Sequence, residues 1–201
     1  MNMNKNNFWI LKGGRVIDPA NGRDEIADLW ISDGIVVEPG SVDEARMQTV
    51  ELDGMIVAPG FTDLHVHLRQ PGNTDAETIR TGTMAAAAGG FTRILAMPNT
   101  NPCADTPGAI QYLKDYSERE GVVKVMPTGA LSKGLAGEEM SPIGSLKAAG
   151  VVALTDDGRC VQNHELMRHL VEYASSFGLP VLDHCEDVVL ANGGVMHEGY
   201  W

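Results

Sequence analysis

A repeating unit of one helix and one short apolar strand governs the sequence after Pro59. The helices are expected to end at glycines at positions 90, 121, 150 and 178, which are 31, 29 and 28 residues apart. A nearly continuous apolar run follows each stop, and such runs are typical of strands buried on both faces of a parallel sheet. Strands that alternate with helices predict an α/β fold in which helices cover that sheet.

The number of units narrows the fold class further. The stretch MIVAPGFTDLHVH (55–67) supplies the first strand, so that the segment over 58–201 holds five strands, each followed by polar residues. This organisation predicts the N-terminal part of a (β/α)8 TIM barrel, about five of its eight strands. In such a barrel the functional site lies at the C-terminal ends of the strands.

Capping residues mark where several of the helices begin. Thr74 is expected to cap the first helix, with Glu77 three residues later completing a capping box. Thr106 opens the second helix, because the proline that follows it suits the first helical position. Asn163 is expected to cap the fourth helix.

Residues 1–57 follow a different pattern of short strands and tight turns. Apolar and polar residues alternate before the chain turns at Asp33-Gly34, a pair that favours β-hairpins. The same Asp-Gly signal recurs at 53–54. We therefore expect a small all-β module over 1–57 and a separate barrel segment over 58–201.

Polar side chains gather at the ends of the five strands, whose tails read HVHLR, MPNT, PTGA, TDDG and DHCED. In a barrel these tails meet at one mouth. The residues brought there would be His65, His67, Arg69, Asn99, the pair Asp156-Asp157, and His184. The two histidines and the arginine would share one face of a strand, because residues i, i+2 and i+4 do.

This set of side chains indicates metal chemistry. Imidazoles together with a carboxylate suit Zn²⁺, and one carboxylate can bridge two ions. Zinc lowers the pKa of bound water toward ~7 and polarises a carbonyl group. The chemistry indicated is hydrolysis of an amide or a similar bond, or the reverse reaction.

Some of these residues also have plainer explanations. An H-x-H pair alone does not distinguish metal ligands from structural histidines, and Asn99 is also typical of a turn. Three further side chains are expected to be structural, solvated or capping residues: Asp63, His164 and His169. Cys185 could be a ligand, but a buried thiol is the simpler interpretation, and His197 is assigned no role.

Composition argues against several other classes of protein. Lys and Arg number 15 against 27 Asp and Glu, a net charge of −12 that disfavours nucleic acid as a partner. No apolar run approaches the ~20 residues of a membrane span, and the N-terminal stretch lacks the apolar core of a signal peptide. Three cysteines without C-x-x-C spacing predict a cytoplasmic protein without a disulfide framework: Cys103, Cys160 and Cys185.

The motif PGFTDLHVHLRQPG resembles the first metal motif of the amidohydrolase superfamily, in the form found in class I dihydroorotases. AMPNTNP, TDDG and DHCED are similar to later motifs of that family and follow in the same order. Hydantoinases and allantoinases share H-x-H but usually carry a carboxylated lysine where this chain has LTDDG. In the family the β-module is a β-sandwich of strands from both termini, so residues 1–57 would be its N-terminal part.

The resemblance implies roles for individual residues. The metal ligands implied are His65, His67, Asp157 and His184, and the implied substrate-binding residues are Arg69 and Asn99. Asp157 would bridge two zinc ions, although chemistry alone leaves Asp156 open as the bridge. The implied reaction interconverts N-carbamoyl-L-aspartate and (S)-dihydroorotate in pyrimidine (UMP) biosynthesis, with one or two zinc ions as cofactor.

Length is where this sequence departs from the family. A further histidine ligand and the aspartate that acts as general acid/base are expected beyond Trp201. We therefore expect a fragment that is inactive by itself as a dihydroorotase and that oligomerises or aggregates through open barrel edges. The alternatives are a non-catalytic dihydroorotase-like scaffold for aspartate transcarbamoylase, and a cyclic amidase of the hydantoinase or allantoinase type.

Overall fold

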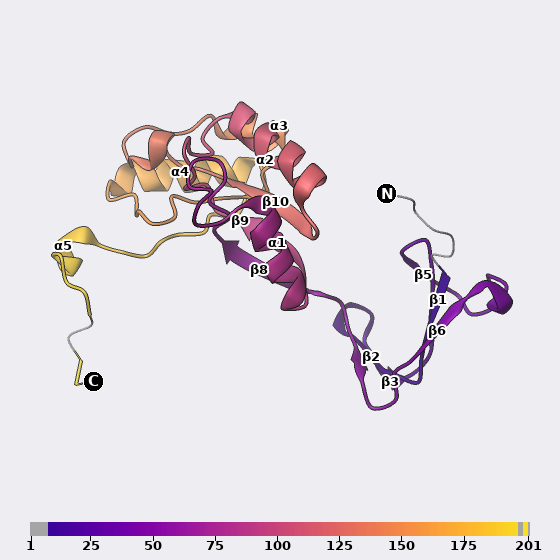
Figure 1. The fold of residues 1–201 in the computed structure, drawn as a ribbon. Coiled ribbons are helices and arrows are strands. Elements are labelled where there is room, and N and C mark those ends of the chain that lie inside the picture. The colour runs from indigo at the N-terminus through magenta and orange to yellow at the C-terminus, as the bar shows by residue number, and fades with distance from the viewer. Residues whose placement is uncertain (1–7, 197–198, 201) are drawn as a thin grey trace. The chain divides into compact units, whose positions relative to one another are not determined.

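The computed structural model describes residues 8–196 and 199–200, so His197 lies outside the described residues. The chain divides into two compact units, Met1–Pro59 and Gly60–Trp201 (Figure 1). Within the described ranges, no helix has both the length and the apolar character needed to cross a bilayer.

Two small β-sheets form the first unit. The four-stranded sheet has the order β5-β4-β1-β6, with β1 (Phe8–Lys12), β4 (Leu29–Ser32), β5 (Ile35–Val37) and β6 (Gln48–Glu51). The three-stranded sheet has the order β3-β2-β7, with β2 (Arg15–Asp18), β3 (Arg23–Ile26) and β7 (Ile56–Val57). Asp33 and Gly34 form the expected hairpin turn between β4 and β5, with the positive φ angles (50° and 80°) that this tight turn requires.

The second Asp-Gly pair, Asp53-Gly54, makes a turn without a hairpin. It connects β6 to β7, which pair in parallel with β1 and β2 respectively and so belong to different sheets. The chain therefore passes from one sheet to the other at this turn. Two short 3-10 turns also belong to the unit, η1 (Pro19–Asn21) and η2 (Glu44–Arg46).

A parallel four-stranded sheet organises the second unit and confirms the predicted α/β barrel segment. Its order is β11-β10-β9-β8, with β8 (Phe61–Val66), β9 (Phe91–Ala96), β10 (Lys124–Gly129) and β11 (Ala153–Leu154). The fifth expected strand is reduced to a single parallel bridge between Val181 and Leu154. Because β11 itself has only two residues, it offers the fifth segment a short edge for pairing.

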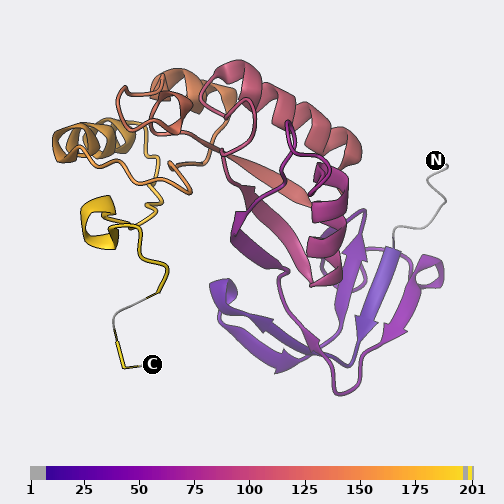
Figure 2. The same cartoon turned by 60° about the vertical axis from the view of Figure 1, so that its left-hand side comes forward.

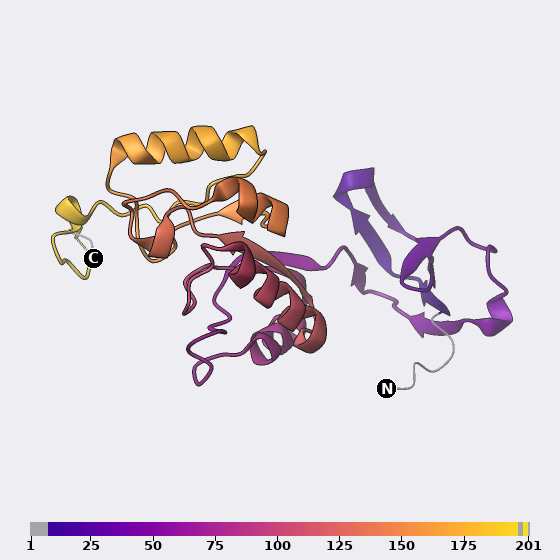
Figure 3. The same cartoon turned by 90° about the horizontal axis from the view of Figure 1, so that it is seen from above.

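The helices that follow the strands are α1 (Ile79–Ala88), α2 (Pro107–Glu120), α3 (Ile143–Ala149), α4 (His164–Ser176) and the short α5 (Val188–Ala191), with a 3-10 turn η3 (Lys133–Leu135) before α3. Of these, α1 and α2 run along one side of the sheet (Figure 2). Thr106 and Asn163 cap α2 and α4 as predicted, accepting hydrogen bonds from the amides of Ala109 and Leu166 at 3.3 and 3.0 Å. In Figure 3, α4 lies beside α3.

The predicted start of the first helix at Thr74 is wrong. The N-cap is Thr78, which exchanges two hydrogen bonds with Thr81 (3.0 and 3.1 Å), and residues 71–77 form turns instead. The side chain of Gln70 accepts a hydrogen bond from the amide of Ile79 at 3.0 Å. Side chains at both ends of the loop therefore satisfy the free amides of the first helical turn, which places the helix start later than the Thr74 signal indicates.

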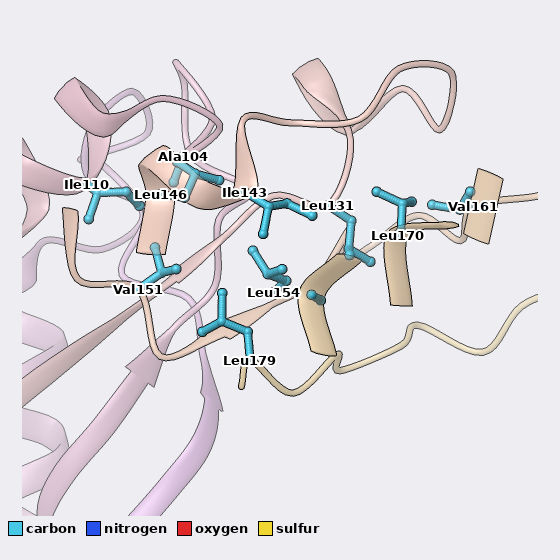
Figure 4. Close-up of a cluster of buried hydrophobic side chains, with 11 residues drawn as sticks. Ala104, Ile110, Leu131, Ile143, Leu146, Val151, Leu154, Val161, Leu170 and Leu179 are labelled. Atoms are coloured by element: carbon cyan, nitrogen blue, oxygen red, sulfur yellow. The ribbon is translucent and has the colours of Figure 1, made fainter. Parts of the chain in front are cut away.

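The main hydrophobic core of the second unit lies where α2, α3 and α4 meet the end of the sheet (Figure 4). Its members are Ala104, Ile110, Leu131, Ile143, Leu146, Val151, Leu154, Val161, Leu170, Ala174 and Leu179. Leu154 is fully buried in this cluster and is followed, two and three residues later, by the aspartate pair of TDDG. Packing of the core therefore determines where those carboxylates lie.

We expect truncation of this core on α4 to weaken folding. Leu170 is fully buried, whereas its neighbour Val171 is 44% exposed. Leu170→Ala should lower the free energy of unfolding by about 2–5 kcal/mol, because it removes buried methyl groups and leaves a cavity. Val171→Ala is the matched control and should change it by less than about 0.5 kcal/mol. Urea denaturation measures both values, and equal effects would contradict this core assignment.

Candidate metal centre

His65 and His67 enter the candidate centre from the end of β8. Their rings lie edge to face, with centroids 5.1 Å apart, as residues i and i+2 on one side of an extended chain can. Asp63 accepts a hydrogen bond from the amide of His65 at 3.0 Å, in keeping with its expected structural role. The side chains of His65 and His67 are 54% and 29% exposed, so both imidazoles are open to a ligand from solvent.

Asp157 comes to these histidines from the loop after β11. Its Oδ1 lies 3.0 Å from His65 Nε2, and its Oδ2 lies 3.5 Å from His67 Nε2. One ligand atom from each of the three residues lies within 4.8 Å of the others. Zinc bonds to such nitrogen and oxygen atoms are about 2.0–2.2 Å long, so a divalent metal ion could be held between them.

The side chain of Asn99, at the end of β9, connects His67 to Asp157. Asn99 Nδ2 donates to Asp157 Oδ2 at 2.9 Å, and its Oδ1 lies 3.0 Å from His67 Nδ1. An ionised carboxylate only accepts hydrogen bonds, so the NH2 group of Asn99 must face Asp157 and its carbonyl oxygen must face His67. His67 therefore carries its proton on Nδ1, and this arrangement is typical of histidines that bind metals through Nε2.

With its proton on Nδ1, a neutral His67 has Nε2 available to bind a cation. In a neutral His67, Nε2 presents a lone pair toward an Asp157 oxygen only 3.5 Å away. Two electron-rich atoms at this distance repel each other unless a positive charge lies between or beside them. A bound proton or a metal ion supplies that charge, and the geometry of the three residues suits either.

Asp156, the alternative to Asp157, points to a different part of the protein. Its Oδ1 accepts from the Ser132 amide at 3.0 Å and its Oδ2 accepts from the Ser132 hydroxyl. Burial raises the pKa of the Asp156 carboxyl, and the hydrogen bonds from Ser132 oppose that rise. Asp156 thus ties the loop after β10 to the end of β11. Sequence reasoning missed Ser132, because nothing in its neighbourhood indicates this pairing.

Arg69 does not continue the strand, contrary to the expectation that it shares a face with the histidines. β8 ends at Val66, and Arg69 has a left-handed backbone with φ 56°. Its side chain still lines a shallow surface hollow together with His65 and His67. In the described part of the chain, its guanidinium forms no ion pair, so its charge is available to an anionic ligand.

His184 lies near the centre without joining its tight cluster. Its Nδ1 is 4.0 Å from Asp157 Oδ1, and its Nε2 is 3.5 Å from Glu186 Oε2. The expected ligand of a second ion is thus held between two carboxylates, one of which the sequence analysis did not single out. Its position two residues after His184 in DHCED was the sequence signal that could have identified Glu186 as a neighbour of this histidine. Cys185, expected to be a buried thiol, is exposed.

A parallel β/α sheet that carries polar side chains at its C-terminal edge places this chain in the class of α/β-barrel proteins. L-hydantoinase (dihydropyrimidinase) from Arthrobacter aurescens has this fold, with a TM-score of 0.77 at 22% identity over 92% of this chain and 42% of that one. D-hydantoinase from Thermus sp. matches with a TM-score of 0.64 at 24% identity over the same shares of the two chains.

Sequence comparison narrows the class to one family. The family model described as dihydro-orotase-like matches residues 54–201, and the chain belongs to this family. A dihydroorotase of Solibacter usitatus is 49% identical over 192 residues, which cover 94% of this chain and 44% of that protein. One of Acetivibrio thermocellus is 47% identical over 96% of this chain and 45% of that protein. The chain spans less than half the length of these relatives.

Proposed function

We propose that this chain contributes the first metal ligands and part of the substrate site of a dihydroorotase. The reaction proposed is the zinc-dependent interconversion of N-carbamoyl-L-aspartate and (S)-dihydroorotate in pyrimidine biosynthesis. The observation that carries the proposal is the convergence of His65, His67 and Asp157, with Asn99 joining His67 to the Asp157 carboxylate. Relatives that are 45–49% identical and named dihydroorotase support it.

His65, His67 and Asp157 would hold the first zinc ion, and His184 would serve a second ion shared through Asp157. When bound, zinc acidifies water and polarises the carbonyl under attack. Asn99 orients His67 and keeps the Asp157 carboxylate in place through its two observed bonds. Its NH2 group has a second N–H, which remains available to a carboxylate oxygen of the substrate.

Arg69 would supply the main contact to the substrate's carboxylate. Both proposed substrates are anions, and the net charge of the chain is −12, so binding needs local positive charge. Arg69 lines the same hollow as the two histidines. A planar fork of N–H donors matches a carboxylate with two parallel hydrogen bonds.

Two other functions compete with this proposal. The solved structures with the same fold are titled hydantoinases, but this chain has Asp157 in TDDG, where the resemblance places a carboxylated lysine in hydantoinases. A non-catalytic scaffold for aspartate transcarbamoylase would not need an intact ligand set. Comparing turnover of dihydroorotate, hydantoin and allantoin by the protein at its natural length separates the three. Turnover of hydantoin alone, or of none of the three, would contradict the proposal.

A conservative change at Arg69 should separate substrate binding from metal binding. Arg69→Lys keeps the charge but loses the two-pronged donor, so we expect affinity for N-carbamoyl-L-aspartate to fall about tenfold, since a charge-assisted bond is worth about 1.5–3 kcal/mol. Calorimetric titration measures that affinity, and elemental analysis should find the zinc content unchanged. Arg80→Lys, an exposed position on α1, is the control. Loss of zinc in Arg69→Lys would mean that Arg69 supports the metal ligands instead.

A further inference from the structure

We propose that Gln70 is a positioning residue, which holds Arg69 in place by tying the loop after β8 to the start of α1. The inference rests on the proposed function, in which Arg69 binds the substrate's carboxylate. The backbone of Arg69 has φ 56°, in the left-handed region that residues other than glycine rarely adopt. Such a backbone persists only where the surrounding structure determines it. The contacts on either side of Arg69 therefore decide the direction in which its side chain leaves the loop.

The residue before Arg69 is anchored in a hydrophobic core. Leu68 is 3% exposed and belongs to the same buried cluster as Ile79, the first residue of α1. The helix also approaches Leu68 closely at Gly82, where an added β-carbon would lie 2.6 Å from Leu68 Cδ2. The first turns of α1 thus form the support against which this side of the loop packs.

The residue after Arg69 is tied to the start of the same helix. The side-chain oxygen of Gln70 accepts a hydrogen bond from the amide of Ile79 at 3.0 Å. Amides in the first turn of a helix lack partners within the helix, so this bond satisfies the helix and fixes the loop together. The side chain of Ile79 is fully buried, which holds its amide in place. Arg69 therefore lies between two neighbours that are both attached to α1.

The next part of the loop contacts the segment after β9. The amide of Asn101 donates to the carbonyl oxygen of Pro71 at 3.1 Å. Gly72 lies so close to this segment that an added β-carbon would be 2.6 Å from the Asn101 carbonyl oxygen. The same segment carries Asn99, which bonds to two residues of the candidate metal centre. The loop that carries Arg69 is thus fixed both to α1 and to the segment that holds the metal ligands.

Among these contacts, the Gln70 bond can be removed without changing the backbone or the core. Gln70→Met keeps an unbranched side chain but loses the carbonyl oxygen that accepts the bond. Arg69 then relaxes toward a negative φ, which redirects its side chain. In the protein at its natural length we expect KM for dihydroorotate to rise about five- to tenfold, in line with the loss of one hydrogen bond. The values of kcat and zinc content should stay unchanged, because only binding common to substrate and transition state is lost.

Thr78→Ala is the matched control for an effect on the helix alone. It removes the N-cap side chain, which accepts from the amide of Thr81 at 3.1 Å, and so weakens the start of α1 to a similar degree. The bond between Gln70 and Ile79 does not involve this side chain, so KM should stay at the wild-type value. Circular dichroism confirms that each variant is folded, and Gln70→Ala is a second variant that removes the same acceptor and should also raise KM.

A double variant tests whether Gln70 acts through Arg69. Arg69→Ala should raise KM by at least about tenfold. Adding Gln70→Met to it should change KM by less than about twofold, because a residue that acts through another has no effect once the other is removed.

The outcomes distinguish this inference from the proposed function. The inference alone is overturned if Arg69→Ala raises KM and the two Gln70 variants do not, if Thr78→Ala raises KM as much as Gln70→Met, or if the effects of Arg69→Ala and Gln70→Met on binding are additive. Absence of dihydroorotate turnover by the wild type, or an unchanged KM in Arg69→Ala, would overturn the proposed function and this inference with it.

Discussion

Replacing either His65 or His67 with alanine should abolish tight zinc binding. Each variant removes one nitrogen from a set of three ligand atoms. Loss of a partner that merely orients a metal ligand already costs about 10–100-fold in metal affinity, so loss of a ligand itself should cost more than about 100-fold. Elemental analysis after dialysis against a weak chelator, with zinc competition titrations, measures the effect.

The control for these variants is His164→Ala, an exposed histidine at the start of α4. It should retain the same tightly bound zinc as the wild type. Unchanged zinc in both His65→Ala and His67→Ala would show that the paired histidines are structural.

The two adjacent aspartates of TDDG should respond to substitution in opposite ways. Asp157→Asn removes the charge that faces both histidines, so zinc affinity should fall more than about 100-fold, while the metal-free protein keeps its stability. Asp156→Ala leaves the amide and hydroxyl of Ser132 without their acceptor. The free energy of unfolding should then fall by about 1–3 kcal/mol, with zinc affinity reduced by no more than about tenfold.

Urea denaturation in the presence of a chelator measures the stability of each variant, and zinc competition measures the affinity. Ser132→Ala is the matched variant for Asp156→Ala, because it removes the hydroxyl donor and should reproduce part of the destabilisation. If Asp157→Asn retained zinc and Asp156→Ala lost it at unchanged stability, the roles assigned to the two carboxylates would be reversed.

The sequence alone was sufficient to predict the architecture of the second unit. Apolar runs separated by glycine-terminated helices indicate a parallel sheet covered by helices, and β8 to β11 form such a sheet. The H-x-H motif, the asparagine of MPNT and the aspartate pair follow three of these strands. Their proximity therefore results from the topology, because parallel strands deliver their C-terminal ends to one edge.

Sequence signals for helix starts and turns were less reliable where more than one residue, or more than one strand pairing, could satisfy them. Thr74 and Thr78 both precede the first helix, and only the loop held by Gln70 and Thr81 determines that Thr78 is the cap. The Asp-Gly pair at 53–54 likewise forms a turn, but pairing with β1 and β2 directs its flanking strands into different sheets.

The tertiary structure alone determined how the site is assembled. Asp156 and Asp157 are chemically identical and adjacent, so no sequence pattern assigns one to Ser132 and the other to the histidines. The side chain of Asn99 decides which nitrogen of His67 carries the proton, since it bonds to both His67 and Asp157. These assignments depend on hydrogen bonds between residues far apart in the chain, and such bonds have direction and distance that only three-dimensional packing specifies.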